Sequence, residues 1–380
     1  MLYNKFVFLY TSNFCTRIND FYNLEDWVAN GYDVEYWDLS AITCHEHLSD
    51  LHVEGLTIRT ITTLREFRNL VKGNRSNNVL YLTWVNYCWY SAGFYSVLSQ
   101  YNCDYAFFDN GLLPSFSYQS KNRKRRVTFG KICHFLRDKY YRYCIKTPLL
   151  KPATFYFQLS DSYKGYDKID SNTIHGWCNA GDYERNRKLQ KAVEGKYIVF
   201  LDQYLPYHND ITLNGQKHID ADLYYSSINN AFSLIETQFG VPVVIAAHPA
   251  ANRYNEINPF EGRRILFNKT AELVKGAELV LAHYTTAISY VVLNRKKMLL
   301  FTSEAIREFS PYIDSYIHQL ANLLCLNCVN LDSYTKEDFC FGIVSEKEYN
   351  DYKYNYLTNI HSESLSNFEC IISALNKKLI

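Results

Sequence analysis

The chain has 380 residues, 47% of them hydrophobic, and a net charge of +1. A chain of this length and composition can bury more than one core, so we expect two domains. The balanced charge and the absence of a recognised binding motif argue against nucleic acid as a partner. The longest uncharged apolar stretch, at 240–247, is far shorter than a membrane-spanning helix. The eleven cysteines have no regular spacing, with a single CxxC pair at Cys325 and Cys328, and follow no secretion signal, which favours reduced thiols in a cytoplasmic protein.

Strand-like and helix-like patterns alternate in the first part of the chain. Strands are predicted where apolar residues form short runs, at 5–10, 32–39, 56–61, 78–84 and 105–109. Helical periodicity lies between them, at 18–30, 62–72 and 87–100. Such alternation predicts a mostly parallel sheet with helices on both faces.

The last of these strands ends at Asp109, within the sequence YAFFDNGLLPSF at 105–116. Ligands of open parallel sheets bind at the carboxyl ends of the strands, so a carboxylate here is a candidate for chemistry. Asn110 and Gly111 follow it and are candidates for the same site. The triplet Asp-Asn-Gly is also typical of an ordinary turn, and the pattern leaves both interpretations open.

A strongly basic insertion follows in the first domain, at 118–150. Between Lys121 and Lys146 it has ten Lys or Arg residues and one Asp, a net charge of +9. Residues 131–146 have helical periodicity, and one face carries Ile132, Phe135, Leu136 and Tyr143. This helix either packs on the protein or meets anionic lipid headgroups or a phosphate-bearing acceptor. The main candidates for such a surface are loop residues: Arg123, Lys124, Arg125 and Arg126.

The second half repeats the alternation. Strands are predicted at 196–203, 241–248, 263–267, 277–283 and 297–301, and helices at 217–238 and 284–294. The polar, glycine-containing segment around 155–190 is the predicted junction between two Rossmann-like domains. We therefore place the domains at 1–185 and 186–360, and we expect a helix at 361–380 to return to the first domain.

Two strand patterns of the second half end in histidine. His248 is followed by Pro249, which ends the strand, and His283 ends a later run. After His283, Thr285 and Thr286 begin a helical pattern, and the N–H groups and hydroxyls of a helix start suit a phosphate. Taken alone, either threonine is better explained as an ordinary helix N-cap.

The order and spacing of three segments are more specific than any single residue. VVIAAHPAANRY at 243–254, NKTAELV at 268–274 and ELVLAHYTTAISYVVLNRKKMLLF at 278–301 resemble one half of a group of bacterial glycosyltransferases. These are the CMP-sugar-using GT-B enzymes of the polysialyltransferase-like and capsule or O-antigen Kdo transferase-like kinds. The resemblance covers roughly 195–305. It implies an α/β GT-B fold of two Rossmann-like domains with a central cleft, the first binding the acceptor and the second the donor nucleotide.

The resemblance also implies roles for individual residues. The donor phosphate and nucleotide would be bound by His248, Pro249, Thr285, Thr286 and His283. The segment YAFFDNGLLPSF is similar to a strand-end segment of capsule Kdo transferases, which makes Asp109 the implied catalytic residue. That family often has a second acidic residue or an Arg nearby, where this chain has Asn110 and Ser115. Further candidates for the cleft are Asn110, Gly111, Asp202, Gln203 and Glu272.

The implied reaction moves a CMP-activated keto sugar, such as Kdo or a sialic or related nonulosonic acid, onto a surface polysaccharide of the O-antigen or capsule kind. Asp109 would deprotonate the acceptor hydroxyl or form a covalent adduct, while His248 and the threonines stabilise the departing phosphate. The scheme requires no metal and no cofactor besides the CMP-sugar. The expected partners are this nucleotide sugar, a glycan or lipid-linked glycan, and the inner face of the plasma membrane. Two alternatives stay open: a UDP- or GDP-sugar transferase or nucleotide-sugar epimerase, and a non-catalytic glycan- or membrane-associated protein.

Overall fold

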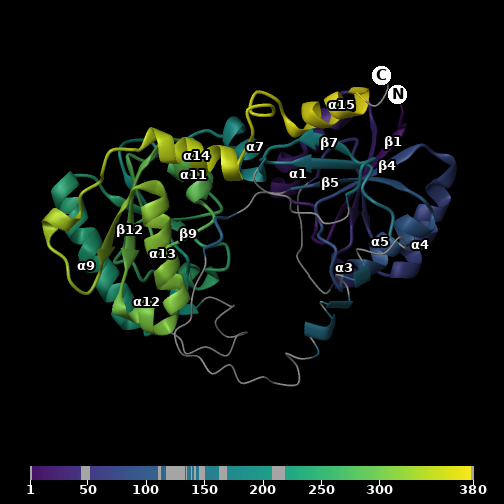
Figure 1. Cartoon of the computed structure of the whole chain (residues 1–380). Helices are drawn as coiled ribbons and strands as arrows, with labels where there is room; N and C mark the ends of the chain where they lie inside the picture. Colours follow the sequence, from purple (N-terminus) through teal and green to yellow (C-terminus); the bar gives the residue numbers. More distant parts are fainter. Residues whose placement is uncertain are drawn as a thin grey trace. The chain divides into compact units, whose positions relative to one another are not determined.

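The computed structural model describes residues 2–43, 52–109, 113–116, 150–161, 169–207 and 219–377, with positions 133, 135–137, 139–140 and 143–144 between them. The chain divides into two compact units: unit 1 comprises 1–112, 121–185 and 354–380, and unit 2 comprises 113–120 and 186–353. Each unit is a parallel sheet with helices packed against it (Figure 1).

Unit 1 has the strand order β3-β2-β1-β4-β5-β6-β7, with every described pair parallel. Its strands are β1 (Lys5–Tyr10), β2 (Asp33–Asp38), β3 (Thr57–Thr60), β4 (Val79–Thr83), β5 (Asp104–Phe108), β6 (Phe155–Gln158) and β7 (Ile174–Trp177). Its helices are α1 (Thr16–Tyr22), α2 (Leu24–Ala29), α3 (Ser40–Thr43), α4 (Leu64–Gly73), the 3₁₀ turn η1 (Asn74–Ser76), α5 (Ala92–Gln100) and α15 (Asn367–Lys377). The central strands are mostly apolar because helices cover the sheet, and every residue of β4 is buried.

Unit 2 has the order β10-β9-β8-β11-β12-β13, again parallel throughout its described pairs. Its strands are β8 (Ile198–Leu201), β9 (Val243–Ala247), β10 (Ile265–Phe267), β11 (Leu279–Ala282), β12 (Lys297–Thr302) and β13 (Asn327–Asn330). Its helices are α9 (Ala221–Phe239), α10 (Thr270–Gly276), α11 (Ile288–Leu293), α12 (Glu304–Phe309) and α13 (Pro311–Leu324), with 3₁₀ turns η2 (Leu205–Tyr207), η3 (Asn252–Asn255) and η4 (Lys336–Asp338). Two helices cross from one unit to the other: α7 (Gly181–Lys188) and α14 (Glu346–Tyr356).

Local signals in the sequence explain where the longest helix lies. Asp220 is the N-cap of α9, and its carboxylate accepts a hydrogen bond from the N–H of Leu223 at 3.1 Å. Gly240 ends the helix in the left-handed conformation, with φ at 67°, which glycine adopts without strain. The helix is therefore bounded at both ends by residues that favour those positions, and β9 begins directly after it.

The predicted strand pattern is confirmed, with three additions. All ten predicted strands are present, within a few residues of the expected bounds. The structure adds β6, β7 and β13. The first two lie inside 155–190, the segment in which the junction was expected, so that segment also contributes strands to unit 1. The chain passes to unit 2 after Arg185, within α7.

The C-terminal segment belongs to unit 1 from Tyr354 onward, rather than from 361. Its helix α15 packs on β7, α1 and α2. The fully buried Asn367 fixes this contact, because its Oδ1 accepts a hydrogen bond from the N–H of Asn179 and its Nδ2 donates to the carbonyl of Phe21, both at 2.7 Å. No helix among the described ranges is both long and apolar enough to cross a membrane.

Candidate functional site

The carboxyl ends of the strands form the candidate functional edge of each sheet. In unit 1, β1 lies between β2 and β4, and in unit 2, β8 lies between β9 and β11. In doubly wound sheets of this order, ligands bind beside the strand ends where the order reverses. Asp202 and His283 follow β8 and β11 at that point of unit 2, whereas Asp109 follows β5, one strand beyond β4, in unit 1.

Asp109 is a buried carboxyl group held by the neighbouring strand. It is 5% exposed, and its backbone N–H donates to the carbonyl of Phe157 at 2.9 Å. Its Oδ2 accepts a hydrogen bond from the Tyr156 hydroxyl, also at 2.9 Å. Burial raises the pKa of Asp109 to about 6, and the bonds from Tyr156 and the Leu159 N–H oppose that rise. The carboxyl group is therefore mostly ionised near neutral pH, and it can still accept a proton, as a general base must.

Two aromatic residues that the sequence did not single out lie where the strand order of unit 1 reverses. Tyr10 ends β1 and Trp84 follows β4, with ring centroids 4.6 Å apart. The indole N–H of Trp84 is buried, and no described group accepts a hydrogen bond from it. A buried donor without an acceptor is unusual and destabilising, which marks this strand end as a position where a bound oxygen atom would be stabilising.

Asp202 is the second buried carboxyl group, in unit 2. It is 6% exposed, and its Oδ1 accepts from the Tyr204 N–H at 3.0 Å. Its Oδ2 is buried, with no hydrogen-bond partner within the described part of the chain. Burial raises the pKa of Asp202 to about 6. The Tyr204 N–H opposes the rise, as does the nearby Tyr254 hydroxyl, although the Tyr254 geometry is not that of a hydrogen bond.

Gln203 connects the ends of two strands. Its Oε1 accepts from the N–H of Tyr284, after β11, at 3.2 Å, and its Nε2 donates to the carbonyl of Leu201 at 3.3 Å. The tyrosines around Asp202 are also linked: the hydroxyls of Tyr225 and Tyr254 are 2.8 Å apart. The sequence places Asp202 and Gln203 among the candidates, but it gives no sign of these tyrosines, which come from α9 and the loop after β9.

His248 begins the turn after β9. Its Nδ1 accepts a hydrogen bond from the N–H of Ala250 at 3.1 Å, and its carbonyl accepts from the N–H of Ala251 at 2.9 Å. An Nδ1 that accepts cannot carry the proton, so the neutral ring carries it on Nε2, which is then a donor. His248 is partly exposed and Pro249 is exposed. A protonated Nε2 is a donor of the kind that a phosphate needs.

His283 does not fit the role expected for it. The residue is completely buried, and burial lowers its pKa to about 4. Its Nδ1 donates to the carbonyl of Phe301 at 2.9 Å, so its Nε2 accepts from the Tyr224 hydroxyl, also at 2.9 Å. Both ring nitrogens are used inside the core, and neither is left for a donor phosphate.

The predicted helix start at the two threonines is also corrected. Helix α11 begins at Ile288, and Thr285 and Thr286 lie in the turn before it. The Thr285 hydroxyl accepts a hydrogen bond from the N–H of Ala287 at 3.2 Å, so it closes this turn rather than capping a helix. A phosphate at this position would meet a turn followed by a helix of six residues, without the field of a long helix.

Of the remaining candidates, only Glu272 lies within the described residues. Glu272 lies in the first turn of α10, where its carboxylate forms an ion pair with Lys269 at 3.3 Å, and it lines a hollow of about 450 Å³ with Leu266 and residues 188–192. The other predicted positions lie outside the described residues: Asn110, Gly111, Arg123, Lys124, Arg125 and Arg126.

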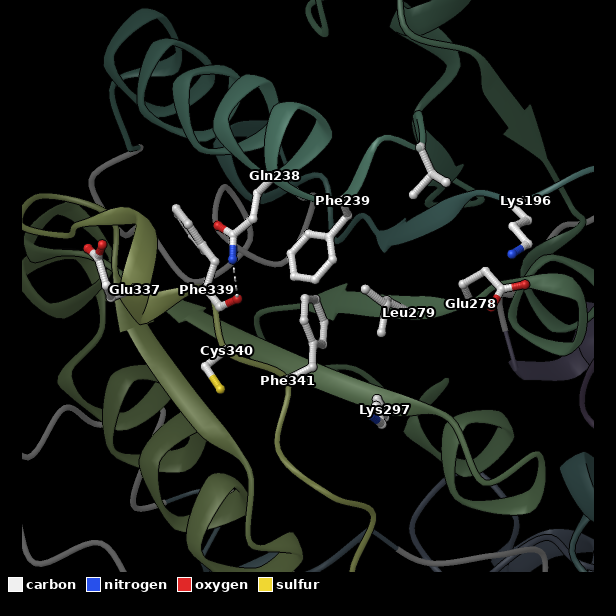
Figure 2. A pocket seen from close by; sticks show the side chains of 11 residues that line it. Lys196, Gln238, Phe239, Glu278, Leu279, Lys297, Glu337, Phe339, Cys340 and Phe341 are labelled. Atoms are coloured by element: carbon white, nitrogen blue, oxygen red, sulfur yellow. Dashed lines mark hydrogen bonds between the residues drawn. The ribbon is translucent and has the colours of Figure 1, made fainter.

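A larger hollow, of about 700 Å³, lies at the opposite edge of the unit 2 sheet. Its lining includes Lys196, Glu278 and Lys297, which lie at or just before the amino ends of strands, and residues 337 and 339–341 from η4 and the loop after it. Figure 2 shows the rings of Phe239 and Phe341 next to each other in its lining, packed edge to face with centroids 5.4 Å apart. None of the residues predicted for function lines this hollow.

The two sheets define the class of the fold, and comparison with known proteins makes it specific. No family model matches the chain, and no curated protein sequence matches it. Among solved structures, it is similar to a variant of TagF, a wall teichoic acid polymerase, with a TM-score of 0.52 and 11% identity, covering 100% of this chain and 90% of that one. It is also similar to CalG4, the calicheamicin glycosyltransferase, with a TM-score of 0.50 and 8% identity, covering 100% and 98%. The chain therefore has the GT-B fold that the sequence predicted.

Proposed function

We propose that the chain is a glycosyltransferase that moves a CMP-activated keto sugar onto a surface polysaccharide acceptor. The observation that carries the proposal is Asp109, a buried carboxyl group at a strand end whose pKa of about 6 suits a general base. Support comes from the sequence resemblance around His248 and from the fold, which is shared with a protein named a glycosyltransferase and another named a wall teichoic acid polymerase.

The proposed reaction gives separate roles to Asp109 and His248. The acceptor hydroxyl oxygen attacks the anomeric carbon of the keto sugar, its proton passes to Asp109, and the bond from that carbon to the phosphate oxygen breaks. The departing CMP carries the negative charge, which the Nε2–H of His248 stabilises. Because a phosphate ester is already a good leaving group, the scheme needs only a base and a group that donates a hydrogen bond to the phosphate.

The nucleotide is the sharpest test of this proposal. Thermal unfolding is measured with increasing concentrations of CMP, CDP, UDP and GDP. A nucleotide that binds the folded state adds about 2.7 kcal/mol to its stability when its concentration reaches about 100 times its dissociation constant. CMP alone is expected to raise the melting temperature. A response to UDP or GDP instead favours the other transferases or an epimerase. No response to any nucleotide favours a non-catalytic protein.

A further inference from the structure

The helical residues between Cys133 and Cys144 expose an apolar face. The exposed fractions are 58% for Phe135, 59% for Leu136, 62% for Tyr140 and 69% for Tyr143. Leu136, Tyr140 and Tyr143 are spaced by four and three residues, so they lie on one side of the helix. The sequence left open whether this face packs on the protein, and the exposed fractions contradict that interpretation.

A second exposed aromatic segment lies beside this helix. Trp89 is 52% exposed, and Tyr90 is exposed next to it, with ring centroids 5.8 Å apart. The guanidinium carbon of Arg137 lies 4.8 Å from the centre of the Trp89 ring, a cation–π contact that joins the helix to this segment. We call the combined set the aromatic surface: Trp89, Tyr90, Phe135, Leu136, Tyr140 and Tyr143.

Basic residues in the same stretch of sequence indicate what covers the aromatic surface. The sequence between Lys121 and Lys146 has a net charge of +9, against +1 for the whole chain. Within the helix, the Lys139 ammonium lies 4.9 Å from the centre of the Phe135 ring, so basic and apolar groups alternate over a short distance. Helices that bind the interface of anionic bilayers typically combine exposed aromatic and leucine side chains with Lys and Arg.

A soluble anion explains only part of this arrangement. A phosphate or an acidic glycan neutralises the basic groups, but it leaves the apolar side chains in water. An anionic bilayer accounts for the basic groups and for the apolar side chains, because its headgroups pair with Lys and Arg while its interface takes up the rings and the leucine. We propose that the aromatic surface binds the protein to anionic lipid bilayers. This inference does not depend on the chemistry that the protein performs.

The experiment measures binding of the full chain to sedimented vesicles. One set contains phosphatidylcholine alone and the other contains about one third phosphatidylglycerol. We expect binding to the anionic vesicles, with at least a tenfold loss for the triple variant Leu136→Ser, Tyr140→Ser, Tyr143→Ser. Lys139→Gln should lose about fivefold, since attraction to an anionic surface is worth about 1 kcal/mol per basic residue. The exposed positions of these side chains mean that the variants should unfold at the wild-type temperature.

The matched control removes exposed apolar side chains elsewhere. Ile343 is 89% exposed and Ile360 is 70% exposed, and neither belongs to the aromatic surface. The double variant Ile343→Ser, Ile360→Ser should bind vesicles like the wild type. The proposal is overturned if the triple variant binds normally, if this control loses as much, or if soluble dextran sulfate binds as tightly as the vesicles and loses as much binding in the triple variant. Nucleotide binding is measured separately, so failure of the glycosyltransferase proposal leaves this result intact.

Discussion

Two buried carboxyl groups, one in each unit, differ in what holds them. Asp109 and Asp202 each follow a buried strand, they are 5% and 6% exposed, and burial raises the pKa of each to about 6. Asp109 accepts a hydrogen bond from Tyr156, a side chain on the neighbouring strand, and the Leu159 N–H also favours its ionised form. Asp202 accepts from the backbone N–H of Tyr204, two positions along its own loop, and the described residues offer its second oxygen no hydrogen bond.

This difference separates a group oriented for chemistry from one that shapes its own loop. The Tyr156 hydroxyl acts on the charge of Asp109 without fixing any backbone. The Tyr204 N–H belongs to a residue with φ at 55°, a left-handed conformation that bulky side chains rarely adopt. The hydrogen bond to Asp202 helps to hold that conformation. We therefore expect catalysis to depend on Asp109 and the conformation of the loop after β8 to depend on Asp202.

The largest expected effect is on transfer. Asp109→Asn should lower the rate about 100-fold or more, the scale of removing a general base, while CMP affinity stays unchanged. Asp202→Asn should lower it by less than about tenfold, because no proton passes to that group. The measurement is CMP release from CMP-Kdo or CMP-sialic acid in the presence of acceptor. A wild-type rate in Asp109→Asn, or equal losses in both variants, would remove the distinction.

The next effect is on stability, and we expect it to be similar for Asp109 and Asp202. An acid whose pKa is raised by folding contributes stability that is present below the unfolded value of 3.8 and is lost as the pH rises through about 6. Asparagine has no such proton. Between pH 4 and pH 7 the free energy of unfolding of the wild type should therefore fall by up to about 3 kcal/mol relative to Asp202→Asn.

Urea unfolding at the two pH values measures this difference. A pH-independent effect of the asparagine cancels when the two values are subtracted. Asp109→Asn should show a difference of similar size, since burial raises its pKa to the same value. Parallel pH curves for the wild type and both variants would mean that the carboxyl groups are not shifted, and the comparison would lose its electrostatic basis.

The strands could be predicted where each one forms an apolar run in the sequence. The central strands are continuous apolar runs, as in β4, and the sequence locates them directly. The missed strands β7 and β13 are short edge strands with exposed or partly exposed residues, and β6, which is mostly buried, has only four residues. Such strands are stabilised by hydrogen bonds to their neighbours, which a local pattern does not contain.

The site could be predicted only as far as strand ends. His248 and His283 follow equally apolar strands, yet β9 lies next to the edge strand β10 while β11 lies between β8 and β12. The central position buries His283 completely, whereas His248 is partly exposed. The role of Tyr156 depends on a strand pairing that brings it to Asp109 from 47 positions away. Neither fact is encoded in the spacing of nearby residues.

A smaller effect tests whether nucleotide binding is confined to unit 2. His248→Ala should weaken CMP binding about 10- to 100-fold, because a hydrogen bond to a charged group contributes about 1.5–3 kcal/mol. The fold should persist, since the side chain is only partly buried. Isothermal calorimetry with CMP measures the change. His283→Gln provides the contrast, because it removes an imidazole that forms two buried hydrogen bonds and should therefore lower the stability of the protein. Normal CMP binding by His248→Ala would exclude the assigned phosphate contact.

The smallest effect isolates the hydrogen bond that distinguishes Asp109 from Asp202. The Tyr156 hydroxyl favours the ionised form of Asp109, so Tyr156→Phe should raise the pKa of Asp109 above about 6. A base must be ionised, and the transfer rate should therefore fall about tenfold at pH 6 and hardly at all above pH 8. Tyr105→Phe is the matched control, because it also removes a buried hydroxyl of unit 1, one that donates to the carbonyl of Lys151 at 3.0 Å. An unmoved pH profile in Tyr156→Phe, or the same shift in Tyr105→Phe, would show that Tyr156 does not set the charge of Asp109.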